Sequence, residues 1–104
     1  MLDNARLTLE KAESWTAADE ITHLMGQHAS AQQDIPEGIR RFQQCIDYAE
    51  KGQNTSILLK RMRSLFQLYK SHGDIEAAGL VADKAKSLLG QLQQQNTKPS
   101  AAIA

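Results

Sequence analysis

Apolar residues in the second half of the chain recur at spacings of three and four, which is the period of an α-helix with one buried side. Two such stripes follow one another between Ile57 and Leu89, and Gly73 and Asp74 separate them. Glycine suits the left-handed end of a helix, and aspartate can cap the next one, so this segment predicts a helical hairpin with facing stripes. The first stripe holds Leu58, Leu59, Met62, Leu65, Phe66 and Tyr69, and the second holds Ile75, Ala78, Val81, Ala82, Ala85, Leu88, Leu89 and Leu92.

Two helices are expected before residue 34. The first runs from Leu2 to about Glu13, where Leu2, Ala5, Leu9 and Ala12 fall on one side and good helix formers lie between them. Ser14 and Thr16 both offer caps for the second helix, and Thr16 forms an approximate capping box with Asp19 three residues later. Trp15 lies at the joint between them, where a tryptophan usually packs as a wedge between helices.

The clearest boundary follows at Asp34, with aspartate as the cap, Pro36 in the first turn and Glu37 at the capping-box position. This helix ends near Gly52, and Asn54 or Thr55 caps the next one. Residues 1–95 are therefore predicted to form one all-α domain of four to five antiparallel helices in stacked hairpins. Residues 96–104, which are polar and small, are predicted to form a disordered tail.

The hairpin resembles one tetratricopeptide repeat, whose signature is W-x2-L-G-x2-Y, then A-x3-F and a late proline. An earlier hairpin, residues 17–51, matches more loosely, and its offset from the later one is longer than the repeat length of that family. The resemblance implies stacked helical pairs that bind other proteins. Its matching residues are Leu65, Tyr69, Gly73, Asp74, Ala78 and Ala85, while Met62, Phe66, Ala82 and Gly90 depart from the pattern.

The chain of 104 residues is 41% apolar, 5% aromatic, and has a single valine, a balance that favours helices over sheets. The lone Cys45 excludes an internal disulfide and is interpreted as a core residue. The chain shows neither a signal-peptide pattern nor a run of about 18 apolar residues, so no membrane span is expected and the cytoplasm is the expected location.

Twelve basic and twelve acidic side chains cancel, which argues against a protein that grips phosphate backbones. Acids dominate residues 1–37, and bases dominate residues 38–72. We expect acidic and basic helices to face one another, although a charged surface that selects a partner is the alternative. A nucleic-acid-binding patch is a further alternative, and it would use Arg40, Arg41, Lys60, Arg61 and Arg63.

The sequence contains none of the common catalytic or nucleotide-binding motifs, so no enzyme activity, cofactor or metal is predicted. His23 and His28 are five residues apart and diverge on a helix, unlike a zinc pair. One signalling alternative is a histidine phosphotransfer domain, because the residues around His23 superficially resemble its H-x-L-K-G motif. The glycine is one residue too close, however, and Met25 replaces the lysine.

We therefore predict a non-catalytic interaction module, such as an adaptor, chaperone or regulator, that binds a partner polypeptide in a groove between helical hairpins. Its partner would be another protein or peptide, and homodimerisation is the closest competing possibility. The candidate contact residues are Trp15, Arg61, Phe66 and Tyr69. Taken singly, Phe66 and Tyr69 are each more typical of a core residue than of a contact residue.

Overall fold

The computed structural model describes the backbone of residues 2–103 and the side chains of residues 2–93. Within this range the chain forms five helices and no strand, which confirms the all-α prediction. No helix among the described residues has the length and apolarity needed to cross a membrane. The helices are α1 (Leu2–Lys11), α2 (Trp15–Ala31), α3 (Ile35–Lys51), α4 (Thr55–Ser71) and α5 (Ile75–Ile103).

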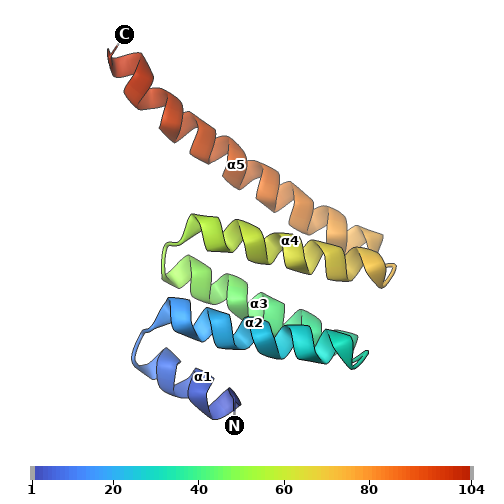
Figure 1. Ribbon diagram of the computed structural model, residues 1–104. Helices are drawn as coiled ribbons and strands as arrows, with labels where there is room; N and C mark the ends of the chain where they lie inside the picture. The colour runs from blue at the N-terminus through green and yellow to red at the C-terminus, as the bar shows by residue number, and fades with distance from the viewer. Residues whose placement is uncertain (1, 104) are drawn as a thin grey trace.

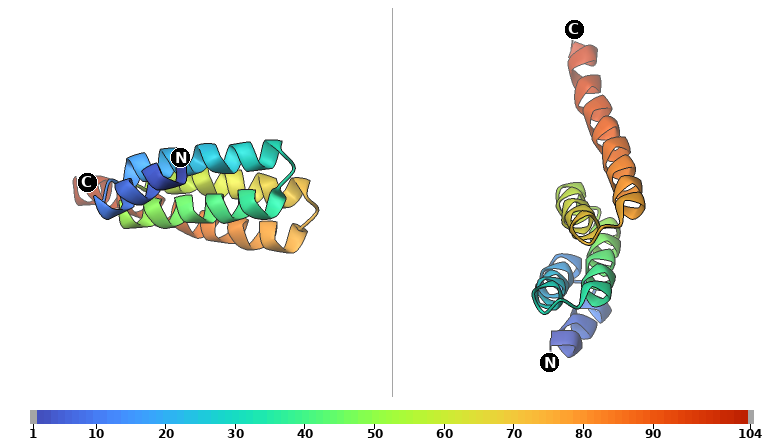
Figure 2. Two further views of the ribbon diagram at one scale, coloured as in Figure 1. Left: turned by 90° about the horizontal axis from the view of Figure 1, so that it is seen from below. Right: turned by 90° about the vertical axis from the view of Figure 1, so that its right-hand side faces the viewer.

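Each helix packs chiefly against the next one in sequence, and the connecting turns alternate between the two ends of the helices (Figure 1). Seen end-on, α2 and α4 lie in one layer and α3 and α5 in the other (Figure 2). The molecule is thin and long, with extents of 53 × 36 × 14 Å. The stack consequently has two ends, and α5 lies at one of them.

The turns recur at a constant interval along the chain. Each turn holds one residue with positive φ, at Glu13 (57°), Gln33 (65°), Gln53 (54°) and Gly73 (87°). The step from the start of α2 at Trp15 to the start of α4 at Thr55 therefore equals the step from Ile35 of α3 to Ile75 of α5.

This constant step defines equivalent positions in the two helix pairs. A residue of α2 has an equivalent in α4, and a residue of α3 has one in α5, so that Asp19 of α2 corresponds to Leu59 of α4. The step agrees with the predicted offset between the hairpins, which exceeds that of tetratricopeptide repeats. Tetratricopeptide-type hairpin stacking stays a prediction.

Side-chain caps begin three of the helices. The carboxylates of Asp34 and Asp74 accept hydrogen bonds from backbone N–H groups three residues on, at 3.4 and 3.1 Å. The side-chain oxygen of Asn54 does the same at 3.1 Å, so Asn54 caps α4 and Thr55 is the first residue of the helix. These caps confirm the predicted boundaries.

Helix α2 begins at Trp15, so Ser14, one of the two predicted caps, holds the N-cap position, although its side chain makes no capping hydrogen bond. The predicted capping box is wrong. Asp19 does not close a capping box with Thr16. It is 1% exposed and turns toward α4, because an arginine there supplies stronger charged donors than a helix N-terminus does.

The core lies between α3 and α4. One cluster joins Phe42 of α3 to Leu65 and Leu68 of α4, and a second joins Ala49 of α3 to Leu58 and Met62 of α4. Residues of α5, including Val81, pack against both clusters from the other side. Helix α4 is thus covered by both α3 and α5.

Cys45 is fully buried in α3, which confirms its interpretation as a core residue. Its thiol donates a weak hydrogen bond to the carbonyl oxygen of Asp19 at 3.5 Å. Burial raises the pKa of the Cys45 thiol far above its usual range. Burial therefore disfavours the thiolate that redox chemistry needs.

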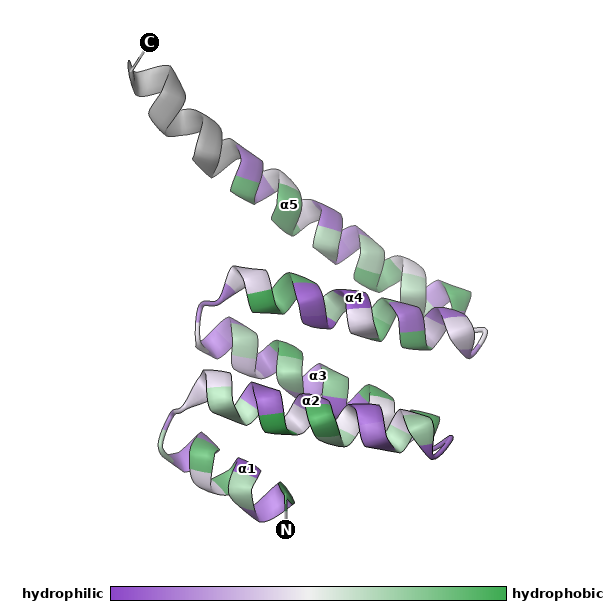
Figure 3. Ribbon diagram, viewed as in Figure 1, coloured by the Kyte–Doolittle hydropathy of each residue, from purple (hydrophilic) through white to green (hydrophobic). Residues whose placement is uncertain are grey.

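The stripe predicted on α5 is only partly buried. Ala78 is buried, but Ile75 is 65% exposed and Leu89 is 47% exposed. The reason is position, because α5 lies at the end of the stack (Figure 3). The predicted domain boundary at residue 95 and the predicted tail over 96–104 are not tested, since the side chains after Gln93 lie outside the described residues.

Candidate functional site

The four predicted contact residues do not form one surface. Trp15 stacks on Tyr48 with ring centroids 6.0 Å apart, and it lies against Gly52 at the α3–α4 turn. The ammonium group of Lys51 lies 5.2 Å from the centre of the indole ring. Trp15 therefore packs the start of α2 onto the end of α3, as the wedge interpretation predicted.

Arg61 makes an internal contact. Its Nε and Nη2 donate hydrogen bonds of 2.9 and 2.8 Å to the two carboxylate oxygens of Asp19. The Arg61 side chain is 14% exposed, and the Asp19 side chain is 1% exposed. This bidentate pair joins α2 to α4, so Arg61 can contact a partner only along its remaining edge.

Phe66 and Tyr69 line two different clefts next to α4. The Tyr69 hydroxyl accepts a hydrogen bond of 3.2 Å from Gln43 Nε2, and its ring packs on the core cluster next to α3. Tyr69 also lines a cleft of mixed polar and apolar character between α3, α4 and α5. Phe66 lines a neighbouring groove between α4 and α5 whose lining is almost entirely apolar.

The α4–α5 groove has a volume of about 330 Å³. Its lining is almost entirely apolar, and two of its α5 residues are alanines, which allow a neighbouring backbone to approach closely. The groove is lined by Leu59, Met62, Arg63 and Phe66 of α4 and by Val81, Ala82, Ala85, Lys86 and Leu89 of α5.

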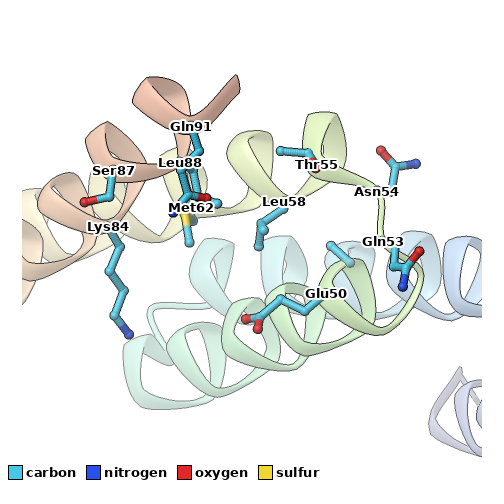
Figure 4. A pocket seen from close by; sticks show the side chains of 11 residues that line it. Glu50, Gln53, Asn54, Thr55, Leu58, Met62, Lys84, Ser87, Leu88 and Gln91 are labelled. Atoms are coloured by element: carbon cyan, nitrogen blue, oxygen red, sulfur yellow. The ribbon is translucent and has the colours of Figure 1, made fainter. Parts of the chain in front are cut away.

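A second cleft, of about 620 Å³, opens between the α3–α4 turn and α5. Figure 4 shows Glu50 on one wall and Lys84 on the other, with Leu58, Met62 and Leu88 between them. Most of the other residues around it are polar. This cleft is therefore more suited to polar contacts than the α4–α5 groove is.

His23 lies on the face shared by α2 and α4. Its ring stacks on Phe42 with centroids 5.3 Å apart. Burial, and next the positive charge of Arg61, lower the pKa of His23. The stacked, half-buried imidazole gives no added support to the phosphotransfer alternative, which stays a prediction.

Several arginines of the basic segment, residues 38–72, form ion pairs within the molecule. Arg41 Nη1 donates to Asp3 at 3.0 Å and its Nε to Glu37 at 3.2 Å, while Arg40 also pairs with Glu37. The Asp3–Arg41 and Asp19–Arg61 pairs join acidic residues of α1 and α2 to basic residues of α3 and α4, as predicted, whereas the Glu37 pairs lie within α3. A nucleic-acid patch would be left with Lys60 and Arg63 as its unpaired bases among the described residues.

Comparison of the chain with protein-family models, with curated proteins and with solved structures finds no match. Among the described residues, no group of three or more histidine, cysteine, aspartate or glutamate side chains is placed to hold a metal ion. The surface of the molecule must therefore be interpreted from its own geometry.

Sequence reasoning missed the pairing of Asp19, and it missed that Phe66 and Tyr69 line two different clefts. One signal could have exposed the regular arrangement. Polar residues that suit a helix N-terminus recur at a constant interval, as Ser14, Asp34, Asn54 and Asp74. That interval alone relates each residue of the first helix pair to its equivalent in the second.

Proposed function

We propose that the protein is a non-catalytic interaction module, an adaptor, chaperone or regulator, that binds a partner polypeptide in the α4–α5 groove. The observation that carries the proposal is the difference between two equivalent grooves. The groove between α2 and α3 is occupied by α4, whereas the groove between α4 and α5 is open.

The open groove has the character of an interaction surface. Phe66 and Leu89 line it, and Leu89 is 47% exposed. Exposed apolar surface of this kind favours association, because covering it removes apolar area from water. The resemblance to a tetratricopeptide repeat supports the same class of function.

A capture experiment with three forms of the tagged protein tests the proposal. Ala85→Glu places a carboxylate in the groove, and Ser87→Glu places the same group on the polar cleft at the other side of α5. Both substitutions introduce the same residue into the same helix. We expect wild type and Ser87→Glu to retain the same partner and Ala85→Glu to lose it.

The result that contradicts the proposal is equal recovery of the partner by all three forms. Loss of the partner with Ser87→Glu alone would move the binding site to the polar cleft. Helical content, measured by circular dichroism, must be unchanged in both variants for the comparison to hold.

A further inference from the structure

We infer that the occupant of the α4–α5 groove is an amphipathic helix of a partner protein, with an apolar stripe at positions i, i+4 and i+7 and an acidic residue beside it. This inference rests on the proposed function and specifies the conformation and chemistry of its partner.

The groove between α2 and α3 (the first groove) indicates that the occupant of the α4–α5 groove (the second groove) is a helix. In the first groove α4 is the occupant, and it presents Arg61, Leu65 and Leu68 to α2 and α3. Leu68 reaches Gly38 of α3, and Leu65 packs with Phe42. These three positions of α4 are spaced i, i+4 and i+7, the spacing of one helix face.

The second groove also pairs one aromatic residue with one small residue, but the aromatic residue lies on the other helix of the pair. In the first pair, Gly26 of α2 lies against the ring of Phe42 of α3. The equivalent positions of the second pair are Phe66 of α4 and Ala82 of α5, and both line the open groove. Each groove thus combines one aromatic ring with one small residue, which leaves room for a helix.

The chemistry of the first stripe position differs between the grooves. Asp19 accepts the charged hydrogen bonds of Arg61 in the first groove. Leu59 occupies the equivalent position of the second groove. An arginine opposite Leu59 would lose water without gaining a carboxylate, so the occupant should carry an apolar residue there.

The acidic residue of the proposed occupant is inferred from the basic residues at the rim of the second groove. Arg63 and Lys86 line it, and neither forms an ion pair with any residue in the part of the chain whose side chains are described. In the first groove the position of Arg63 is taken by His23, which lines the same pocket as Ser64 of α4. An occupant with glutamate at the position of Ser64 would therefore place its carboxylate near Arg63.

The same charges disfavour a second copy of the chain. Two α4–α5 grooves packed face to face around a twofold axis would bring Arg63 and Lys86 of both copies into one interface. Like charges there oppose association. A partner with acidic residues meets no such penalty.

The probe is a synthetic peptide built on the sequence of residues 55–71. It carries leucine at positions 61, 65 and 68, glutamate at position 64, and alanine at its other apolar positions. A second peptide retains arginine at position 61, and a third has proline at position 62 to break the helix. Binding to the full-length protein is measured by fluorescence anisotropy.

We expect the leucine peptide to bind at least about tenfold more tightly than either control peptide, a ratio set by one buried unpaired charge or by loss of the helix. Arg63→Glu in the protein should weaken the leucine peptide about tenfold. Arginine at peptide position 64 should restore binding to that variant, which a merely structural effect would not do.

Three outcomes would overturn the inference. If the proline peptide binds as tightly as the leucine peptide, the occupant is extended and not helical. If the arginine peptide binds as tightly, Leu59 does not discriminate against arginine in the occupant. If the protein forms a dimer in ultracentrifugation and Ala85→Glu dissociates it, the occupant is a second copy of the chain. If the peptides fail while groove-dependent capture of a partner persists, the inference is wrong and the proposed function stands.

Discussion

Removal of the Asp19 carboxylate should be among the most damaging single changes to the stability of this protein. The carboxylate is 1% exposed and its two oxygens accept hydrogen bonds of 2.9 and 2.8 Å from Arg61. Breaking such a buried pair typically costs about 3–5 kcal/mol, because the remaining charge is left without its partner. The Arg61 side chain is 14% exposed and can recover some hydration, which places Asp19→Ala near about 3 kcal/mol.

Removal of both charges should cost much less. In the double variant Asp19→Val with Arg61→Met, no buried charge remains, and side chains of similar shape and volume fill the space between α2 and α4. Replacing a buried pair by apolar residues is often neutral or stabilising, so we expect the double variant to lie within about 1 kcal/mol of wild type. The two single changes are then strongly non-additive.

The assay is urea unfolding followed by circular dichroism, with the free energy of unfolding extrapolated to water. Arg40→Ala is the matched control, because Arg40 pairs with Glu37 at 2.7 Å but its side chain is 54% exposed. Exposed pairs contribute about 0–1 kcal/mol. A loss for Asp19→Ala no larger than that of the control would refute the reasoning, as would a double variant less stable than both single variants.

Three further changes test the turns, the α2–α3 contact and the response to pH by the same unfolding assay. Gln33→Gly should stabilise the protein by about 0.5–1 kcal/mol, because φ at Gln33 is 65°, and no gain would contradict this. Gly26→Ala should destabilise it by about 1–3 kcal/mol, since the new Cβ would lie 2.6 Å from Phe42 Cε1, whereas the control Gly79→Ala has nothing within 4 Å and should stabilise. Burial lowers the pKa of His23 below 6.5 in the folded protein, so the unfolded chain takes up the proton first. Stability should fall as pH drops below about 6.5, and a His23→Gln variant with the same decline would contradict this cause.

Local chemistry made the helices and most of their boundaries predictable. Asp34, Asn54 and Asp74 each act on the backbone three residues away, and Gly73 has the positive φ that its residue type favours. Rules that depend on neighbouring residues succeed at such positions. The all-α class follows from the same local periodicity.

Tertiary partners were not predictable in the same way. Asp19 satisfies a local rule as part of a capping box, but its observed partner, Arg61, lies two helices further along the chain. The left-handed positions at Gln33 and Gln53 carry no sequence signal, because glutamine does not favour positive φ. The constant interval between turns is therefore marked in the sequence only by the residues at the helix starts, Ser14, Asp34, Asn54 and Asp74, and not by the positive-φ residues.

The equivalence of the two grooves gives the stack a direction. The first groove carries Asp19, which accepts only an occupant with a basic residue at the matching position, and α4 supplies Arg61. The second groove carries Leu59 at the equivalent position, so in the proposed complex an arginine there would be disfavoured and α4 of another copy would be a poor occupant. Under the proposed function, this difference between aspartate and leucine favours closure of the first groove by the chain's own α4 and leaves the second groove for a partner helix of different chemistry.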